Sequence, residues 1–120
     1  MSTWRTVIYG NVPSKSNSYR IVTIAGHSSL AKGKALKAYE QSFFMQCGIR
    51  GAMVSSRFLL NIDVYYPSDR SDLDNALKIV LDCLQSCKAI KNDRLCAEIR
   101  ARKLIDKTRP RIELSIENMI

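Results

Sequence analysis

The sequence predicts an α+β fold with the element order β-α-β-α-β-β, arranged as a two-layer sandwich in which two helices cover one face of one mixed sheet. Three observations lead to this class. Several segments alternate between apolar and polar residues, two longer segments carry apolar residues at helical spacing, and no linker or internal repeat separates them. Because 46% of the 120 residues are hydrophobic, residues 1–120 are expected to form a single domain.

The first two predicted elements are a strand and a helix on either side of a polar loop. Residues 4–9 are apolar and rich in strand formers, and the polar stretch 10–18, which contains Pro13, ends this strand. Helix formers return over residues 29–48, which are predicted to be helical. The apolar residues that share one face of this helix are Leu36, Tyr39, Phe43 and Cys47.

Residues 58–66 have the alternation of a strand that packs on one face. Every second residue from Phe58 to Tyr66 is apolar, whereas Asn61 and Asp63 point to the opposite side. Pro67 ends the strand, because proline has no N–H group to donate to a neighbouring strand.

Residues 73–87 give the clearest helical pattern of the chain. One side carries a continuous apolar stripe of Leu73, Ala76, Leu77, Val80, Leu81, Leu84 and Cys87. The other side is polar and carries Asp74, Lys78, Asp82 and Gln85.

Two further alternating runs, residues 95–105 and 111–117, are predicted to be the last strands. Residues 106–110 are expected to form the hairpin turn between them. The predicted inward residues of the first run are Ala97, Ile99 and Ala101. Those of the second run are Ile112, Leu114 and Ile116.

The charge and composition exclude several classes of protein. A formal net charge of +8 suits a polyanionic partner such as DNA or RNA, and residues 1–39 contain no acid. No window approaches the roughly 18 apolar residues of a membrane span, so no membrane partner is expected and a cytoplasmic location follows by default. Residues 33–35 lack the glycine spacing of a phosphate-binding loop, so no nucleotide cofactor is expected.

The cysteines do not have the spacing of a zinc site. They form no C-x-x-C pair, and the single histidine, His27, is remote from them in the sequence. We therefore expect reduced and mostly buried thiols at Cys47, Cys83, Cys87 and Cys96.

Three aspartates, Asp72, Asp74 and Asp93, are the candidate metal ligands. Carboxylates on the binding side of a basic protein repel phosphate unless a divalent cation lies between them, which indicates metal-assisted chemistry on nucleic acid. Residues i and i+2 of a helix point about 200° apart, so Asp72 and Asp74 can share a metal only at a helix entrance. Asp93 must return to this entrance by tertiary folding. Lys78 lies one turn beyond Asp74, where it could touch a scissile phosphate.

Ordinary helix structure offers an alternative explanation for the same residues. Ser71 and Asp74 fit a capping box, and acids in the first turn are favoured by the helix dipole in any protein. Lys78 and Asp82 fit a surface pair at i, i+4, and residues 92–93 fit an ordinary turn.

The run Asp72-Leu73-Asp74-Asn75, followed by Lys78 and later by Asp93, resembles the RusA family of Holliday junction resolvases. The resemblance covers most of the chain, including the loop 13–19, the start of the helix at 33–39 and the closing strands. It implies that Asp72, Asp74 and Asp93 bind Mg²⁺, with Mn²⁺ as an alternative ion, and are catalytic. It also implies that Lys78 assists at the phosphate and that Asn75 supports the site.

The implied activity is the resolution of four-way DNA junctions by paired, symmetric nicks with 5′-phosphate ends, during recombination and repair. Because a junction has approximate two-fold symmetry and needs two matched cuts, a homodimer suits this activity, and the resemblance implies the same. The candidate DNA-binding residues, besides Asn75 and Lys78, are Lys15, Arg20, Lys32, Lys34 and Arg70.

This sequence departs from the family pattern at two places. Residues 68–71 stand where an arginine-rich run is expected, and residues 15–17 lack a paired asparagine. These departures concern the DNA contacts and the sequence preference rather than the metal ligands. Two other functions stay open: a non-catalytic nucleic-acid-binding module, and a metal nuclease that prefers another DNA structure.

Overall fold

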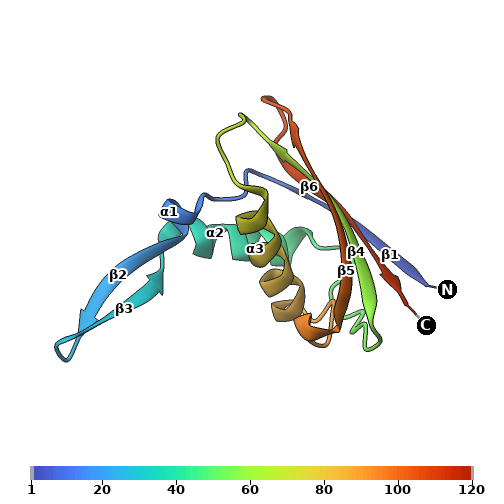
Figure 1. Cartoon of the computed structure of the whole chain (residues 1–120), viewed down its shortest axis with the longest axis horizontal. Helices are drawn as coiled ribbons and strands as arrows, with labels where there is room; N and C mark the ends of the chain where they lie inside the picture. The colour runs from blue at the N-terminus through green and yellow to red at the C-terminus, as the bar shows by residue number, and fades with distance from the viewer. Residues whose placement is uncertain (1, 120) are drawn as a thin grey trace.

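The computed structural model describes residues 2–119 and has a mixed four-stranded sheet as its centre (Figure 1). The strand order is β1 (Thr3–Tyr9), β6 (Arg111–Asn118), β4 (Phe58–Tyr66) and β5 (Cys96–Ile105). β6 pairs antiparallel with both β1 and β4, whereas β5 pairs parallel with β4. The two central strands therefore come from distant parts of the chain.

One face of this sheet is apolar and buried, as the alternation predicted. β4 buries every second residue from Phe58 to Tyr66 and leaves Asn61 exposed on the other face. In β6 the buried residues are Ile112, Leu114 and Ile116. The predicted facing of both strands is confirmed.

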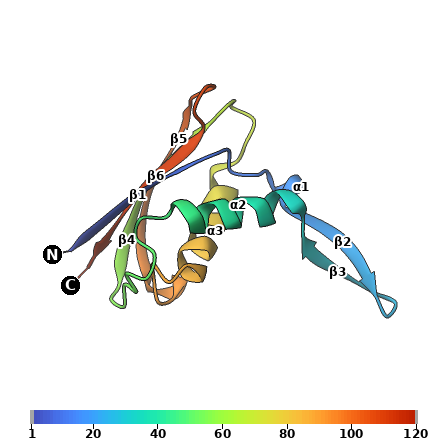
Figure 2. The ribbon, with the colours of Figure 1, turned by 180° about the vertical axis from the view of Figure 1, so that it is seen from behind.

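Two helices cover the buried face, α2 (Lys34–Gln46) and α3 (Leu73–Ser86) (Figures 1 and 2). α2 buries Leu36, Tyr39 and Phe43, and Cys47 directly after it is also buried. The buried residues of α3 are Ala76, Ile79, Val80, Cys83 and Leu84. The core thus includes Ile79 and Cys83, whereas the predicted core residues Leu73, Leu77 and Leu81 are only partly buried. The α+β sandwich class is confirmed.

The segment between β1 and α2 differs from the prediction. A short helix α1 (Lys15–Ser18) is followed by a hairpin of β2 (Tyr19–Ile24) and β3 (His27–Lys32), which stands clear of the sheet (Figures 1 and 2). The predicted helix over 29–48 is therefore wrong at its start. The turn residues Ala25 and Gly26 both have positive φ, 53° and 81°, which is the backbone of a tight two-residue hairpin turn.

The last two strands are not a hairpin, because β4 lies between them. Residues 106–110 cross the end of β4, where the Asp106 N–H donates to the Tyr66 carbonyl oxygen at 2.8 Å. β5 is consequently an edge strand, and its predicted inward residues Ala97 and Ile99 are exposed. No helix within residues 2–119 has both the length and the apolar character to cross a membrane.

Candidate metal and DNA site

The carboxylates of Asp72 and Asp74 are carried by the first turn of α3, directly after the loop that follows β4. Asp72 is the N-cap residue, with an extended backbone (φ −94°, ψ 133°), and its side chain makes no capping hydrogen bond. Both residues are exposed, and neither carboxylate forms an ion pair or hydrogen bond with any of residues 2–119. The capping box with Ser71 as N-cap is not observed, because the cap lies one residue later.

The last residue of β4 holds the backbone of Asp72 in place. The Tyr66 hydroxyl donates to the Asp72 carbonyl oxygen at 3.0 Å, and Tyr66 itself is buried. Burial, together with the negative charges of Asp72 and Asp74, raises the pKa of Tyr66 to about 12. Both carboxylates therefore act on the same phenol, which is consistent with a shared cluster of negative charge.

Asn75 and Lys78 connect this end of α3 to the N-terminal loop. Asn75 donates from Nδ2 to the Pro13 carbonyl oxygen at 3.0 Å, which ties the helix to the segment before α1. Lys78 Nζ lies 6.0 Å from the centroid of the Tyr19 ring, at the base of the β2–β3 hairpin. The loop 13–19 therefore borders the first two turns of α3, and Lys78 is an exposed cation on the same helix as the acid pair.

Asp93 lies at the opposite end of α3, in the short 3₁₀ helix η1 (Asp93–Leu95). Its backbone N–H donates to Oε1 of Gln85, in the last turn of α3, at 2.9 Å. Since α3 has 14 residues, Gln85 is about 20 Å along the axis from Asp72. Within residues 2–119 no three His, Cys, Asp or Glu side chains converge as a metal site. The expectation that folding brings Asp93 beside Asp72 and Asp74 is therefore not met within one chain.

Asp93 instead borders a cleft of about 370 Å³. Most of the residues that line it are charged or polar: Lys32, Asp82, Gln85, Ser86, Lys88, Lys91 and Asp93. Charges of both signs thus lie at this second end of the helix, away from the Asp72 and Asp74 pair.

The candidate DNA-binding cations are exposed and come from different elements of the fold. Lys15 in α1 and Arg20 in β2 belong to the segment that borders the start of α3, and Arg70 lies in the loop before it. Lys32 Nζ forms an ion pair with Glu40 Oε2 at 2.7 Å, and this charge-assisted hydrogen bond raises the pKa of Lys32. Lys34 opens α2 just beyond the hairpin.

Some residues of the site were missed from sequence alone. No sequence pattern singles out Tyr19, because tyrosine is common in strand packing, and only tertiary folding reveals its proximity to Lys78. The contacts of Pro13 and Tyr66 also join segments distant in sequence, so no local pattern could identify them.

The start of α3 thus carries two exposed carboxylates that have no partner in residues 2–119, in a protein with a net charge of +8, and carboxylate oxygens are ligands of the kind that divalent cations bind. The sequence profile of Endodeoxyribonuclease RusA matches residues 12–117. The chain belongs to the RusA endodeoxyribonuclease family. It is accordingly an endodeoxyribonuclease that resolves Holliday junctions and binds branched DNA, in a family of divalent-metal-dependent nucleases. No curated protein matches the chain.

Proposed function

We propose that the protein resolves four-way DNA junctions with Mg²⁺, making symmetric nicks in opposing strands that leave 5′-phosphate ends. The observation that carries this proposal is the Asp72 and Asp74 pair, whose carboxylates have no partner in residues 2–119. An Asp72 that served only as a helix cap would accept a hydrogen bond from the N-terminal N–H groups of α3, and its side chain accepts none.

The donor set fits Mg²⁺ better than a metal that needs a closed protein cage. Mg²⁺ keeps several waters and is commonly held by one or two carboxylates together with substrate phosphates. Asp72 and Asp74 supply such carboxylates, and Mn²⁺ suits the same oxygen donors. When bound, the cation offsets negative charge at the phosphate and makes water a better nucleophile.

The other residues of the helix start would orient the DNA. Lys78 carries positive charge one turn from Asp74, where it would interact with the scissile phosphate and stabilise charge in the transition state. Asn75 would keep the loop before α1 against α3 through its hydrogen bond to Pro13. Tyr66 would set the direction in which the Asp72 side chain projects from the start of α3.

Asp93 enters this proposal through a homodimer. Because α3 separates Asp93 from Asp72 by about 20 Å, two copies with antiparallel α3 helices would bring Asp93 of one copy to the acid pair of the other. A two-fold axis would create two such sites, which matches the two-fold symmetry of a junction. Each composite site would then contain Asp72 and Asp74 with the Asp93 of the second copy.

The backbone contacts would come from the exposed cations Lys15, Arg20 and Arg70 near the start of α3, and from Lys34 at the start of α2. Lys32 is a weaker candidate, because its charge is already paired with Glu40. Binding that rests on such contacts weakens steeply as the salt concentration rises.

Purified protein, incubated with a synthetic four-way junction or with matched duplex, tests this proposal. We expect paired nicks in the junction with Mg²⁺, no nicks with chelator, and no cleavage of the duplex. Asp74→Asn should lower cleavage by about 100-fold or more while junction binding is retained. The matched control is Asp69→Asn, because Asp69 is an exposed acid of the preceding loop that pairs with Lys103 at 2.9 Å.

The outcomes separate the alternatives. Equal cleavage by Asp74→Asn and the parent would remove this residue from the mechanism. Binding that is independent of Mg²⁺, without any strand scission, would indicate a non-catalytic binding module. Cleavage of flaps or single strands in preference to the junction would indicate a nuclease with another structure preference.

A further inference from the structure

Two thiols from distant parts of the chain meet at the ends of the covering helices. Cys47 is the C-cap of α2 and Cys87 is the C-cap of α3. Their Sγ atoms lie 3.8 Å apart and share a hydrogen bond, and only 1% of Cys47 and 4% of Cys87 is exposed. The proposed nuclease mechanism makes no use of this pair.

The remaining cysteines have different surroundings. Cys96 lies in the edge strand β5, is partly exposed, and directs its thiol at the Glu98 carbonyl oxygen at 3.7 Å. Cys83 lies one turn before Cys87 and is buried. Cys47 and Cys87 are thus a specific pair, and Cys96 offers an internal reference for thiol reactivity.

A small molecule can reach Cys87 through a cleft of about 210 Å³. Cys83 and Cys87 line this cleft together with Lys32, Glu40, Phe44 and Ser86. A water molecule occupies about 30 Å³ in the liquid, so a hydroperoxide of similar size fits inside. Cys47 is not among the residues that line this cleft.

The contact also sets the order in which the thiols react. The hydrogen bond between the two thiols lowers the pKa of Cys87 and raises the pKa of Cys47. Cys87 is therefore the thiol of the pair that more readily forms the thiolate, which is the nucleophilic form. Cys87 is thus both the member of the pair that lines the cleft and the member whose pKa is lowered.

We propose that Cys87 and Cys47 form a reversible oxidation site that responds to hydrogen peroxide or a small organic hydroperoxide. The Cys87 thiolate attacks the outer oxygen of the peroxide, the O–O bond breaks, and a sulfenic acid forms as hydroxide leaves hydrogen peroxide, or as an alkoxide leaves an organic hydroperoxide. The Cys47 thiol then attacks the Cys87 sulfur, and water leaves as the disulfide forms. Two thiols and one peroxide give one disulfide and, with hydrogen peroxide, two waters.

The disulfide would join the C-terminal ends of the two helices that cover the sheet. The sulfur atoms must approach from 3.8 Å to about 2 Å, which requires side-chain rotation and a small backbone movement. Backbone hydrogen bonds already join the segment after Cys47 to the segment at Cys87, from Gly51 N–H to the Cys87 carbonyl oxygen and from Met53 N–H to that of Lys88. The cross-link would close a long loop and raise the midpoint of thermal unfolding by about 5–10 °C.

Titration of the full-length protein with hydrogen peroxide, followed by mass spectrometry and peptide mapping without reductant, tests the proposal. We expect the protein to lose the mass of two hydrogen atoms, a Cys47–Cys87 cross-linked peptide, and reversal by dithiothreitol. Cys47→Ala should instead stop at a Cys87 sulfenic acid, which dimedone traps, and should react more slowly than the parent because the hydrogen bond that lowers the pKa of Cys87 is lost. Cys96→Ser and Cys83→Ser are the matched controls and should still form the cross-link.

The peptide map of the oxidised parent protein tests the proposed disulfide even if a variant folds poorly. A cross-link between Cys83 and Cys87 would overturn the assignment of Cys47 as the resolving thiol. Intact Cys47 and Cys87 under conditions that fully oxidise Cys96 would overturn the proposal as a whole.

Discussion

The Tyr66 hydroxyl donates a hydrogen bond of 3.0 Å to the carbonyl oxygen of Asp72, and so joins the last residue of β4 to the N-cap of α3. Tyr66 is 1% exposed, so its ring is a rigid part of the core while its hydroxyl reaches the candidate metal site. The strand end thereby fixes the direction from which the Asp72 carboxylate projects.

Tyr66→Phe should lower the free energy of unfolding by about 1 kcal/mol, the typical net contribution of one hydrogen bond. It should also reduce Mg²⁺-dependent junction cleavage several-fold, because Asp72 loses its support. Urea unfolding and a single-turnover cleavage assay measure the two effects.

Tyr39→Phe is the matched control for this variant. The Tyr39 hydroxyl is buried and has no hydrogen-bond partner in residues 2–119, so its removal should leave stability unchanged or raise it. Equal losses of stability and cleavage in the two variants would show that the Tyr66 contact has no special role.

Lys78→Gln should reduce cleavage by about 100-fold, while junction affinity falls only slightly, because one phosphate contact contributes little to the total binding. Lys37→Gln removes an exposed charge from α2 and serves as the control. Cleavage rates at saturating enzyme separate the chemical step from binding. A loss of affinity alone, with the same rate at saturation, would assign Lys78 to DNA binding only.

The sequence predicted the elements whose patterns are local. The alternation over residues 58–66 and the position of Asp72 and Asp74 at a helix entrance both depend on neighbouring residues, and the structure agrees with each. The hairpin over 19–32 has weak alternation. The last residues of β3 were therefore predicted as the start of the helix that follows Gly33. The position of Asp93 depends on tertiary folding, so the sequence could not establish it.

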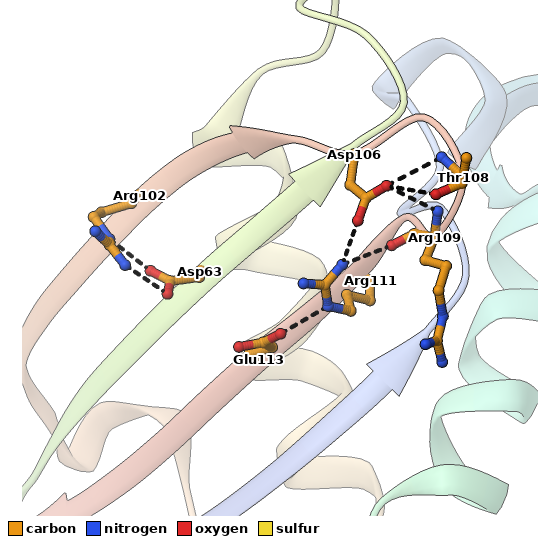
Figure 3. Close-up of polar contacts among 7 residues, drawn as sticks. All are labelled: Asp63, Arg102, Asp106, Thr108, Arg109, Arg111 and Glu113. Atoms are coloured by element: carbon orange, nitrogen blue, oxygen red, sulfur yellow. Dashed lines mark hydrogen bonds and ion pairs between the residues drawn. The ribbon is translucent and has the colours of Figure 1, made fainter.

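The connection between β5 and β6, residues 106–110, is stabilised by the carboxylate of Asp106 (Figure 3). It accepts hydrogen bonds from the backbone N–H groups of Thr108 and Arg109, from the Thr108 hydroxyl, and from Arg111. On the same sheet, Asp63 and Arg102 form an exposed two-point ion pair between β4 and β5 (Figure 3). The Asp106 cluster differs from that pair because it holds backbone groups of a turn.

The bonds to Asp106, led by that from Arg109 N–H, lower the pKa of its carboxyl from 3.8 to about 2. The folded-state pKa lies below the unfolded one, so the ionised carboxylate stabilises the fold above about pH 4. This contribution is lost as the pH falls through about 2. Asp106→Asn should therefore unfold at lower urea than the parent near neutral pH, and the difference should shrink on acidification.

Asp69→Asn is the comparison for this pH series. The Asp69 carboxylate forms an ion pair with Lys103 but accepts no hydrogen bond from the N–H groups of a turn. The effect of Asp69→Asn on the urea midpoint should therefore be small at every pH of the series. A difference between the parent and Asp106→Asn that stays constant as the pH falls through this range would contradict the assigned role of the charge.

Mixing two inactive variants tests whether Asp93 acts across a dimer. If each site combines the acid pair of one copy with Asp93 of the other, a mixed dimer of Asp74→Asn and Asp93→Asn has one fully mutated site and one intact site. Free exchange at equal amounts makes about half of the dimers mixed, and these should restore cleavage as single nicks rather than paired cuts. Differently tagged copies verify the exchange, and each variant alone provides the inactive baseline. Verified exchange without any recovered nicking would show that no site is shared between the copies, because only an arrangement across the interface restores a complete set of ligands.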